Sequence, residues 1–262
     1  MPDSGHHVLM GGVSARTRRT AVVSGGGTGI GMAIAAGLLA DGCDVMLLGR
    51  REEVLRDAAA SLDELGSVFT HAVDLSDPEA VEAAAPEIVA ALGGSIDVVV
   101  ANAGRGAARP GESLESHRDA WLDAIAGNTM TAVLLVEGLR SALSDTGRLI
   151  FISSAAATGP GGAAYGAAKA ALHGWMYDLA VELGPSGVTC NIVSPGFIDD
   201  TDLFGGRLPD DRRADFVERT LTKTLGVPTD VADCVRWLAA PGTGYVTAQV
   251  IGIDGGALVD PG

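Results

Sequence analysis

The sequence contains few of the residues that build disulfide frameworks and metal centres. Its 262 residues include three cysteines. Cys43, Cys190 and Cys234 are odd in number, widely spaced and form no Cys-x-x-Cys pair. Such a set argues against a disulfide framework and against a zinc site. We therefore expect reduced thiols in or near the core and no metal centre.

Two further absences concern membranes and polyanions. No uninterrupted apolar run approaches the roughly 20 residues that span a bilayer, and the first residues lack the apolar stretch of a signal peptide. The formal net charge is -15, and the one short basic stretch is 16–19. Such a chain has little to attract nucleic acid or an acidic membrane surface. These features favour a cytoplasmic protein with a small-molecule partner.

The sequence does contain the material for a large core and a regular alternation of elements. Hydrophobic residues make up 47% of the chain, which is enough for a substantial core. From Thr20 onward, short β-branched runs alternate with longer Ala- and Leu-rich segments. The expected strands are 20–24, 43–49, 67–73, 96–102, 147–153, 187–193 and 250–254. The expected helices are 29–40, 51–65, 77–92, 114–143, 162–184 and 229–239.

This alternation predicts an α/β fold, a doubly wound (Rossmann) parallel sheet of seven strands with helices on both faces. We expect one domain over 18–262, preceded by a flexible extension at 1–17. A long polar stretch, Pro195–Val227, separates the sixth expected strand from the last helix. Because a doubly wound sheet binds ligands at the carboxyl ends of its strands, this stretch predicts a substrate lid at about 196–226.

Five glycines lie within eight residues directly after the first expected strand, in SGGGTGIG at Ser24–Gly31. A dinucleotide-binding turn requires this context, but the spacing Gly25-x-x-x-Gly29-x-Gly31 does not fit G-x-G-x-x-G. The physical requirements still match. Gly25 permits a tight turn, Gly29 lets the backbone approach a pyrophosphate, and Gly31 lets the helix pack closely on the sheet. A slack turn is the alternative that the glycines alone leave open.

Further motifs come after the glycine turn in a fixed order. They are Asp74 in AVDLS, ANAG at Ala101–Gly104, Asn128 in GNTM, FISS with Ser154, YGAAK with Tyr165 and Lys169, and SPGFIDDT with Pro195, Gly196 and Thr201. Together with the glycine spacing, they resemble the single-domain branch of the short-chain dehydrogenase/reductase family. The resemblance runs from about Thr20 to Val259, with Ala101 in place of the family's first asparagine.

The resemblance implies a catalytic set of Asn128, Ser154, Tyr165 and Lys169. Tyr165 and Lys169 are four residues apart in an expected helix and share one face, so the ammonium is expected to lower the phenol pKa from about 10. Tyr165 would be the general acid in carbonyl reduction and the general base in alcohol oxidation. Ser154 would bond the substrate oxygen, while strand alternation turns Ser153 to the other face. Asn128 would help to hold a water that links Lys169 to solvent.

One departure from the family's pattern lies between two of these residues. Ten residues separate Ser154 from Tyr165, one or two fewer than the family usually has. We expect this shorter loop to remodel one wall of the substrate pocket.

The resemblance also implies a nicotinamide cofactor. An NAD site places an acidic residue about 20 residues beyond the glycine turn, where this chain has Gly49 followed by Arg50 and Arg51. Two guanidinium groups suit a 2′-phosphate, so we expect NADP(H) in preference to NAD(H). The alternative is that the two arginines simply begin a solvated helix. The implied cofactor-binding residues are Gly25, Gly27, Thr28, Gly29, Ile30, Gly31, Arg50, Arg51, Asp74, Leu75, Asn102, Ala103, Gly104, Tyr165, Lys169, Pro195, Gly196, Ile198 and Thr201.

The predicted function is hydride transfer between NADP(H) and the carbonyl or secondary alcohol group of a small molecule. A catalytically silent nucleotide-binding regulatory or scaffold protein on the same fold is the alternative, and loss of the tyrosine or lysine would be its sign. Phe197, Leu203 and Phe204 predict an apolar lid. Arg105 and Arg109 are either contacts to an anionic substrate tail or solvated loop charges.

The resemblance also implies a homotetramer assembled through two long helices and the last strand. The apolar candidates for this interface are Trp121, Leu122, Ile125 and Met130 on one helix and Leu172, Trp175 and Met176 on the other. Burial on the sheet is the alternative explanation for part of this apolar surface.

Overall fold

The computed structural model describes residues 18–107, 110–160, 162–199, 201 and 210–259. Three expectations from the sequence concern residues outside these ranges: the N-terminal extension at 1–17, Arg109, and the lid residues Leu203 and Phe204.

A single sheet of seven parallel strands forms the centre of the molecule, in the order β3-β2-β1-β4-β5-β6-β7. The strands are β1 (Thr20–Ser24), β2 (Asp44–Gly49), β3 (Val68–Ala72), β4 (Ile96–Ala101), β5 (Leu143–Ile152), β6 (Thr189–Pro195) and β7 (Gln249–Ile253). The strand order reverses between β1 and β4, and ligands of doubly wound sheets bind at the carboxyl ends of the strands beside such a point. The expected fold class is confirmed.

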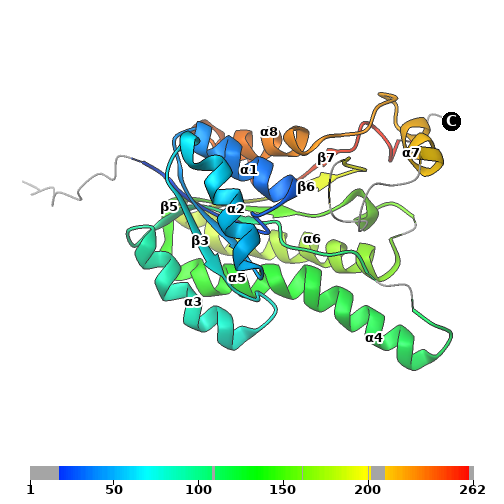
Figure 1. Cartoon of the computed structure of the whole chain (residues 1–262), viewed down its shortest axis with the longest axis horizontal. Helices are drawn as coiled ribbons and strands as arrows, with labels where there is room; N and C mark the ends of the chain where they lie inside the picture. Colours follow the sequence, from blue (N-terminus) through cyan, green and yellow to red (C-terminus); the bar gives the residue numbers. More distant parts are fainter. Residues whose placement is uncertain (1–17, 108–109, 161, 200, 202–209, 260–262) are drawn as a thin grey trace, which may run out of the picture.

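Helices cover both faces of this sheet (Figure 1). One face carries α1 (Gly29–Ala40), α2 (Glu52–Leu62) and α8 (Pro228–Ala239), and the other carries α3 (Pro78–Ala91), α5 (Thr131–Leu139) and α6 (Ala163–Leu183). Each strand contributes side chains to the cores on both faces of the sheet, because successive side chains point to opposite faces. In β1, for example, Val22 faces the α3, α5 and α6 layer, while Ala21 and Val23 face the α1 and α8 layer.

The helical stretch Leu114–Ala142 is long and apolar enough to cross a membrane by length and composition. It consists of α4 (Leu114–Ile125), a π-helical turn at Ala126–Met130, α5, and a short 3₁₀ turn. However, 44% of its most apolar window is buried inside the molecule, and Leu135 and Leu139 belong to the core. Packing on the sheet therefore accounts for the apolar character of α5, whereas Trp121, Leu122 and Ile125 of α4 remain exposed.

The three cysteines are free, as the sequence predicts, with Cys43 and Cys190 buried and Cys234 half-buried. Two other features differ from expectation. β5 begins at Leu143, four residues before its expected start, because it pairs with β4 at Ile96 before a bulge. The expected lid also contains a helix, α7 (Asp210–Arg219), which buries none of its residues and so has little of the apolar pattern that reveals a helix in a sequence.

On α6, burial on the sheet, rather than assembly, accounts for the apolar residues that the sequence offered as interface candidates. Leu172 and Met176 are 1% and 0% exposed, because they pack on the sheet. Trp175 is partly buried against Phe151, with ring centroids 5.3 Å apart. These side chains are therefore core residues, and the exposed apolar groups of α6 are Tyr177 and Val181 instead.

Candidate active site

The glycine turn adopts a conformation that requires glycine. Gly25 and Gly29 have φ values of 64° and 49°, which side chains of L-residues disfavour. A Cβ on Gly31 would lie 2.1 Å from the carbonyl oxygen of Gly25. The turn is therefore a tightly fixed structure, and the slack-turn alternative does not fit it.

Hydrogen bonds from β4 hold this turn in place. The Ser24 hydroxyl accepts the backbone N–H groups of Asn102 and Ala103, both at 2.9 Å. The Asn102 side chain donates to the Ser24 carbonyl at 2.9 Å. Ser24 and the ANAG segment thus fix the turn at the point where the strand order reverses.

The helix after the turn has an uncapped N-terminus. Thr28, the residue before α1, makes no side-chain capping hydrogen bond to the described residues, whereas Asp77 caps α3 and Ser113 caps α4. The first N–H groups of a helix have no partner within the helix, and the helix dipole favours an anion there. A side chain on Gly29 would enter the space facing Thr201, 3.6 Å away. These features fit the pyrophosphate of a dinucleotide.

A second set of site residues surrounds the end of β5. Ser154 follows the strand, and its hydroxyl accepts the N–H of Ala156 at 3.2 Å. Burial raises the pKa of the Tyr165 phenol, and a hydrogen bond with Ser154 partly opposes this effect. The expectation that Lys169 lowers the pKa of this phenol is not met in the structure. The Lys169 ammonium instead donates to the Ile152 carbonyl at 2.9 Å.

Lys169 is the buried cation of the site. Its side chain is on α6, and the residue is 3% exposed. Burial lowers its pKa from 10.5 to about 8, because desolvation disfavours the charged form. The ammonium therefore carries a charge near neutral pH at a cost in stability.

Gly104 provides the space in which Lys169 and Asn128 approach each other. A Cβ on Gly104 would lie 2.7 Å from Asn128 Oδ1 and 3.0 Å from Lys169 Nζ. Asn128 is 0% exposed and sits in the π-helical turn, a feature that is frequent at functional sites. Its amide donates to the carbonyls of Arg105 and Ala124 at 2.9 and 3.0 Å, and its oxygen accepts the Arg105 N–H at 3.0 Å.

Ser153 points away from Ser154, as strand alternation predicts. Its buried hydroxyl lies 3.2 Å from the Lys169 carbonyl oxygen and 2.9 Å from His173 Nε2. Sequence reasoning missed His173. The available signal was its position four residues after Lys169, which places it one helical turn along the same face.

Arg50 and Arg51 are exposed at the start of α2. Asp74 lies near this edge, where its carboxylate accepts the backbone N–H and hydroxyl of Ser76 at 2.9 and 2.6 Å. These two hydrogen bonds, together with the charge of Arg50, hold the Asp74 pKa below its ordinary value. The Arg50 guanidinium and the Asp74 carboxylate thus lie on the same side of the site.

The segment after β6 closes the site on another side. The two ends of the expected lid pair with each other, through Asp199 N–H to the Gly226 carbonyl at 2.9 Å and Gly226 N–H to the Phe197 carbonyl at 3.2 Å. The Thr201 hydroxyl donates to the Ile198 carbonyl at 3.2 Å. Further along, Phe216 of α7 stacks on Phe197 with centroids 4.3 Å apart, which fixes α7 to the base of the lid.

The remaining predicted residues lie around these groups. Leu75 and Ile198 are 3% and 5% exposed. Partly exposed positions are Gly27, Thr28, Ile30, Ala103 and Gly196, and Pro195 is buried at the end of β6. Arg105 is not a free cation, because it forms an ion pair with Asp123 of α4. The solvated-loop alternative for Arg105 is therefore closer to the structure than a contact to a substrate tail.

Comparisons with known proteins bear on what this site is. A family model described as Enoyl-(Acyl carrier protein) reductase matches residues 25–257. The chain is 34% identical over 252 residues to the short-chain reductase protein NovJ of Streptomyces niveus, covering 93% of this chain and 95% of that protein. It is 34% identical over 243 residues to the 3-oxoacyl-[acyl-carrier-protein] reductase FabG of Escherichia coli strain K12, covering 91% and 96%.

Solved structures agree with these relatives. A short chain dehydrogenase from Burkholderia cenocepacia J2315 in complex with NADP matches with a TM-score of 0.83 and 34% identity, over 92% of this chain and 98% of that one. The matches in sequence and structure extend over nearly the whole chain. The protein therefore belongs to the short-chain dehydrogenase/reductase family of oxidoreductase enzymes.

Proposed function

We propose that the protein transfers a hydride between NADP(H) and the carbonyl or secondary alcohol group of a small molecule. One observation carries this proposal: Ser154, Tyr165, Lys169 and Asn128 gather at the end of β5. There, Gly104 lets Asn128 and Lys169 approach each other. An uncapped helix N-terminus suited to a pyrophosphate lies at the neighbouring β1 end. A silent scaffold protein would have no need to keep a buried lysine at such a cost.

Tyr165 is the proposed proton donor to the carbonyl oxygen in reduction, and the acceptor of that proton in oxidation. Ser154, whose hydroxyl interacts with the phenol, would donate a hydrogen bond to the substrate oxygen as charge develops there. Lys169 would hold the cofactor ribose, and Asn128 would help to connect the Lys169 ammonium to solvent. When bound, the nicotinamide supplies or accepts the hydride.

The preference for NADP(H) rests on the end of β2 and the two arginines directly after it. Gly49 leaves that strand end without an acidic side chain, and the exposed guanidinium groups of Arg50 and Arg51 suit a 2′-phosphate. The NADP complex of the Burkholderia cenocepacia relative supports the same preference. Fluorescence titration of NADPH and NADH tests it, and tighter binding of NADH would overturn it.

We also propose a cytoplasmic homotetramer of single-domain subunits, each with a substrate lid at 196–226. Exposed apolar side chains on α4 support the assembly, with Trp121 45%, Leu122 58% and Ile125 37% exposed. Light scattering tests the oligomer, and a monomeric mass would contradict it. The backbone hydrogen bond between Asp199 and Gly226 joins the two ends of the lid segment, which supports treating 196–226 as a single lid.

The experiment that tests the proposed function is NADPH turnover across a panel of carbonyl compounds, with alcohols and NADP⁺ in the reverse direction. Tyr165→Phe removes only the phenolic hydroxyl, so it should bind NADPH like the parent and lose nearly all turnover. A variant with parental turnover would show that the proton donor is assigned wrongly. NADPH binding without turnover of any compound would favour the silent scaffold.

A further inference from the structure

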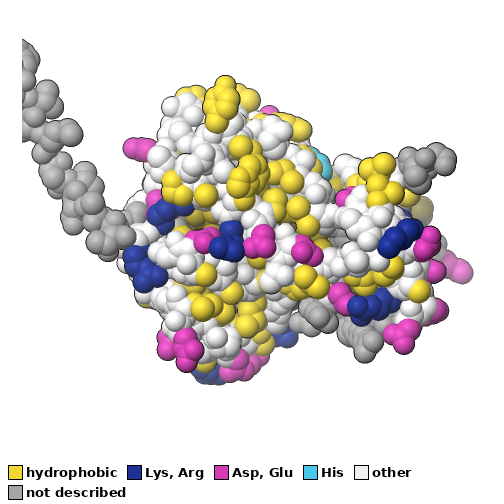
Figure 2. Space-filling model, turned by 90° about the horizontal axis from the view of Figure 1, so that it is seen from above, with side chains coloured by type: hydrophobic (Ala, Val, Ile, Leu, Met, Phe, Trp, Pro, Cys, Tyr) yellow, Lys and Arg dark blue, Asp and Glu magenta, His cyan; other side chains and the backbone are white. Residues whose placement is uncertain are grey.

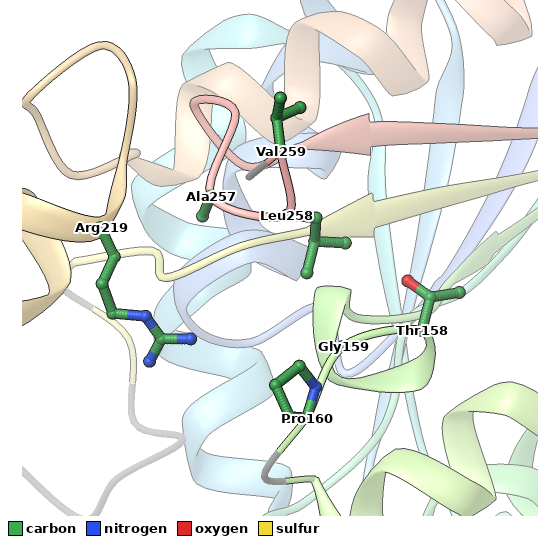
Figure 3. Close-up of a pocket in the computed structure, with 7 residues that line it drawn as sticks. All are labelled: Thr158, Gly159, Pro160, Arg219, Ala257, Leu258 and Val259. Carbon is green, nitrogen blue, oxygen red and sulfur yellow. The ribbon is translucent and has the colours of Figure 1, made fainter. Parts of the chain in front are cut away.

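A pocket of about 410 Å³ opens beside the loop that connects Ser154 to Tyr165. Three segments line it: Thr158–Pro160 of that loop, Arg219 at the end of α7, and Ala257–Val259 near the C-terminus (Figure 3). One 3₁₀ turn, Ala155–Ala157, separates its wall from Ser154. The pocket therefore adjoins the proposed site of reaction.

The walls of this pocket are fixed by contacts between the three segments. A Cβ on Gly159 would lie 2.6 Å from Leu258 Cδ2, so the loop and the C-terminal turn are already in close contact. The Gly255 carbonyl accepts the N–H groups of Leu221 and Thr222 at 2.8 and 3.2 Å. These bonds tie the C-terminal turn to the chain just after Arg219. The space is thus a built pocket rather than a gap between loose segments.

Arg219 provides the charge in an otherwise mostly apolar lining. Its guanidinium extends from α7 toward Pro160 and Leu258 in Figure 3. None of the seven described lining residues carries a carboxylate. Arg219 contacts the Phe216 ring, 5.9 Å from its centroid, and among the described residues it forms no ion pair.

Two nearby carboxylates already have other cationic partners. The surface around α7 carries side chains of both signs (Figure 2). Of its acidic residues and their neighbours, Asp199 pairs with Arg213, and Glu218 pairs with Lys223 at 2.9 Å. A guanidinium that faces an apolar pocket without a carboxylate partner is suited to bind a planar anion from the ligand.

We propose that this pocket receives the end of the substrate remote from the reacting carbonyl, and that this end is a carboxylate bound by Arg219 and carried on an apolar chain. The substrate class is then the oxo acids, or the hydroxy acids in the reverse direction. Pro160, Leu258 and Val259 would cover the apolar chain, and Arg219 would fix its length by binding the terminal group. This inference rests on the proposed function, because it uses the same site of reaction.

The test combines binding with turnover, in the parent and in Arg219→Met. Isothermal titration compares octanoate with octanamide, which differ in charge but little in shape. We expect octanoate to bind the parent about 10-fold more tightly than Arg219→Met, as for a hydrogen-bonded charge that is partly exposed to solvent. Octanamide should bind both proteins equally. Equal binding of octanoate to both would overturn the inference.

Turnover is measured with oxo acids of graded chain length and their methyl esters. The parent should prefer the acid about 10-fold in kcat/KM at the matching length, and Arg219→Met should lose this preference while keeping its activity on the ester. Arg219→Lys retains the charge and should retain part of the preference. Arg212→Met removes an exposed arginine of α7 that does not line the pocket, and it should behave like the parent.

The outcomes separate this inference from the proposed function. If acids and esters are reduced equally well by the parent, the protein is an oxidoreductase and the Arg219 site is wrong. If no compound is reduced but octanoate still distinguishes the parent from Arg219→Met, the anion site stands and the proposed function is wrong.

Discussion

Burial of the Lys169 ammonium should make the stability of the cofactor-free protein depend on pH in a defined direction. The pKa of Lys169 is lowered from 10.5 to about 8, so between these values the unfolded chain binds a proton that the folded protein has released. Stability therefore rises with pH across this window. At about 1.4 kcal/mol per pKa unit, the full contribution is about 3 kcal/mol. About 2 kcal/mol of it should appear between about pH 7 and about pH 9.5.

The assay is urea unfolding of the parent and of Lys169→Met at several pH values in this range. The variant also loses the hydrogen bond to the Ile152 carbonyl, but that loss adds a nearly constant offset. The stability of the parent relative to the variant should increase by about 2 kcal/mol as the pH rises. Lys223→Met, which removes the exposed ammonium of the chain's other lysine, is the matched control. A pH-independent difference between parent and Lys169→Met would refute the reasoning.

Three further substitutions, with Gly174→Ala as a control, test the packing of the site. Gly31→Ala would place a Cβ 2.1 Å from a carbonyl oxygen of the glycine turn, so urea unfolding should show a loss of about 2 kcal/mol, and NADPH titration a weaker affinity. Gly104→Ala should lower kcat at least about 10-fold by displacing Lys169, whereas Gly174→Ala, with nothing within 4 Å, should leave kcat unchanged and stabilise α6 by about 0.5–1 kcal/mol. Ser153→Ala should cost about 1–3 kcal/mol in urea unfolding, because it leaves the half-buried His173 imidazole and the buried Lys169 carbonyl without their shared partner.

Each of these substitutions has a contradicting result. Parental NADPH affinity in Gly31→Ala would show that the glycine stretch is an ordinary turn and not a cofactor-binding one. Equal kcat values for Gly104→Ala and Gly174→Ala would show that Gly104 provides no needed space. Parental stability of Ser153→Ala would show that its hydrogen bonds contribute nothing net.

The sheet could be predicted from the sequence because each strand is a short apolar run bounded by a turn. Val22 and Val23 face the buried cores on opposite sides of the sheet. The sequence of β1 is therefore continuously apolar, as is typical of central parallel strands. The glycine turn was predictable for a related reason. The positions that need a positive φ or a close approach, Gly25, Gly29 and Gly31, admit no other residue without strain.

The features that were not predictable depend on contacts between distant segments. The sequence around Leu172 and Met176 leaves open whether the sheet or another subunit covers them, and the structure shows that the sheet does. The Lys169 ammonium bonds the Ile152 carbonyl rather than acting on the phenol. This contact depends on how α6 packs against the end of β5, which the local sequence does not show. α7 could not be predicted because it buries none of its residues. Its contacts, the stack of Phe216 on Phe197 and the ion pair of Arg213 with Asp199, join it to the segment after β6.

The most direct test of the central claim follows the hydride itself. NADPH deuterated at the transferable position of the nicotinamide is incubated with the protein and a carbonyl compound that it consumes, and the product is examined by mass spectrometry. The account predicts an alcohol that carries one deuterium on the former carbonyl carbon, and no such product with Tyr165→Phe. An unlabelled product, or a labelled product formed equally well by Tyr165→Phe, would contradict it.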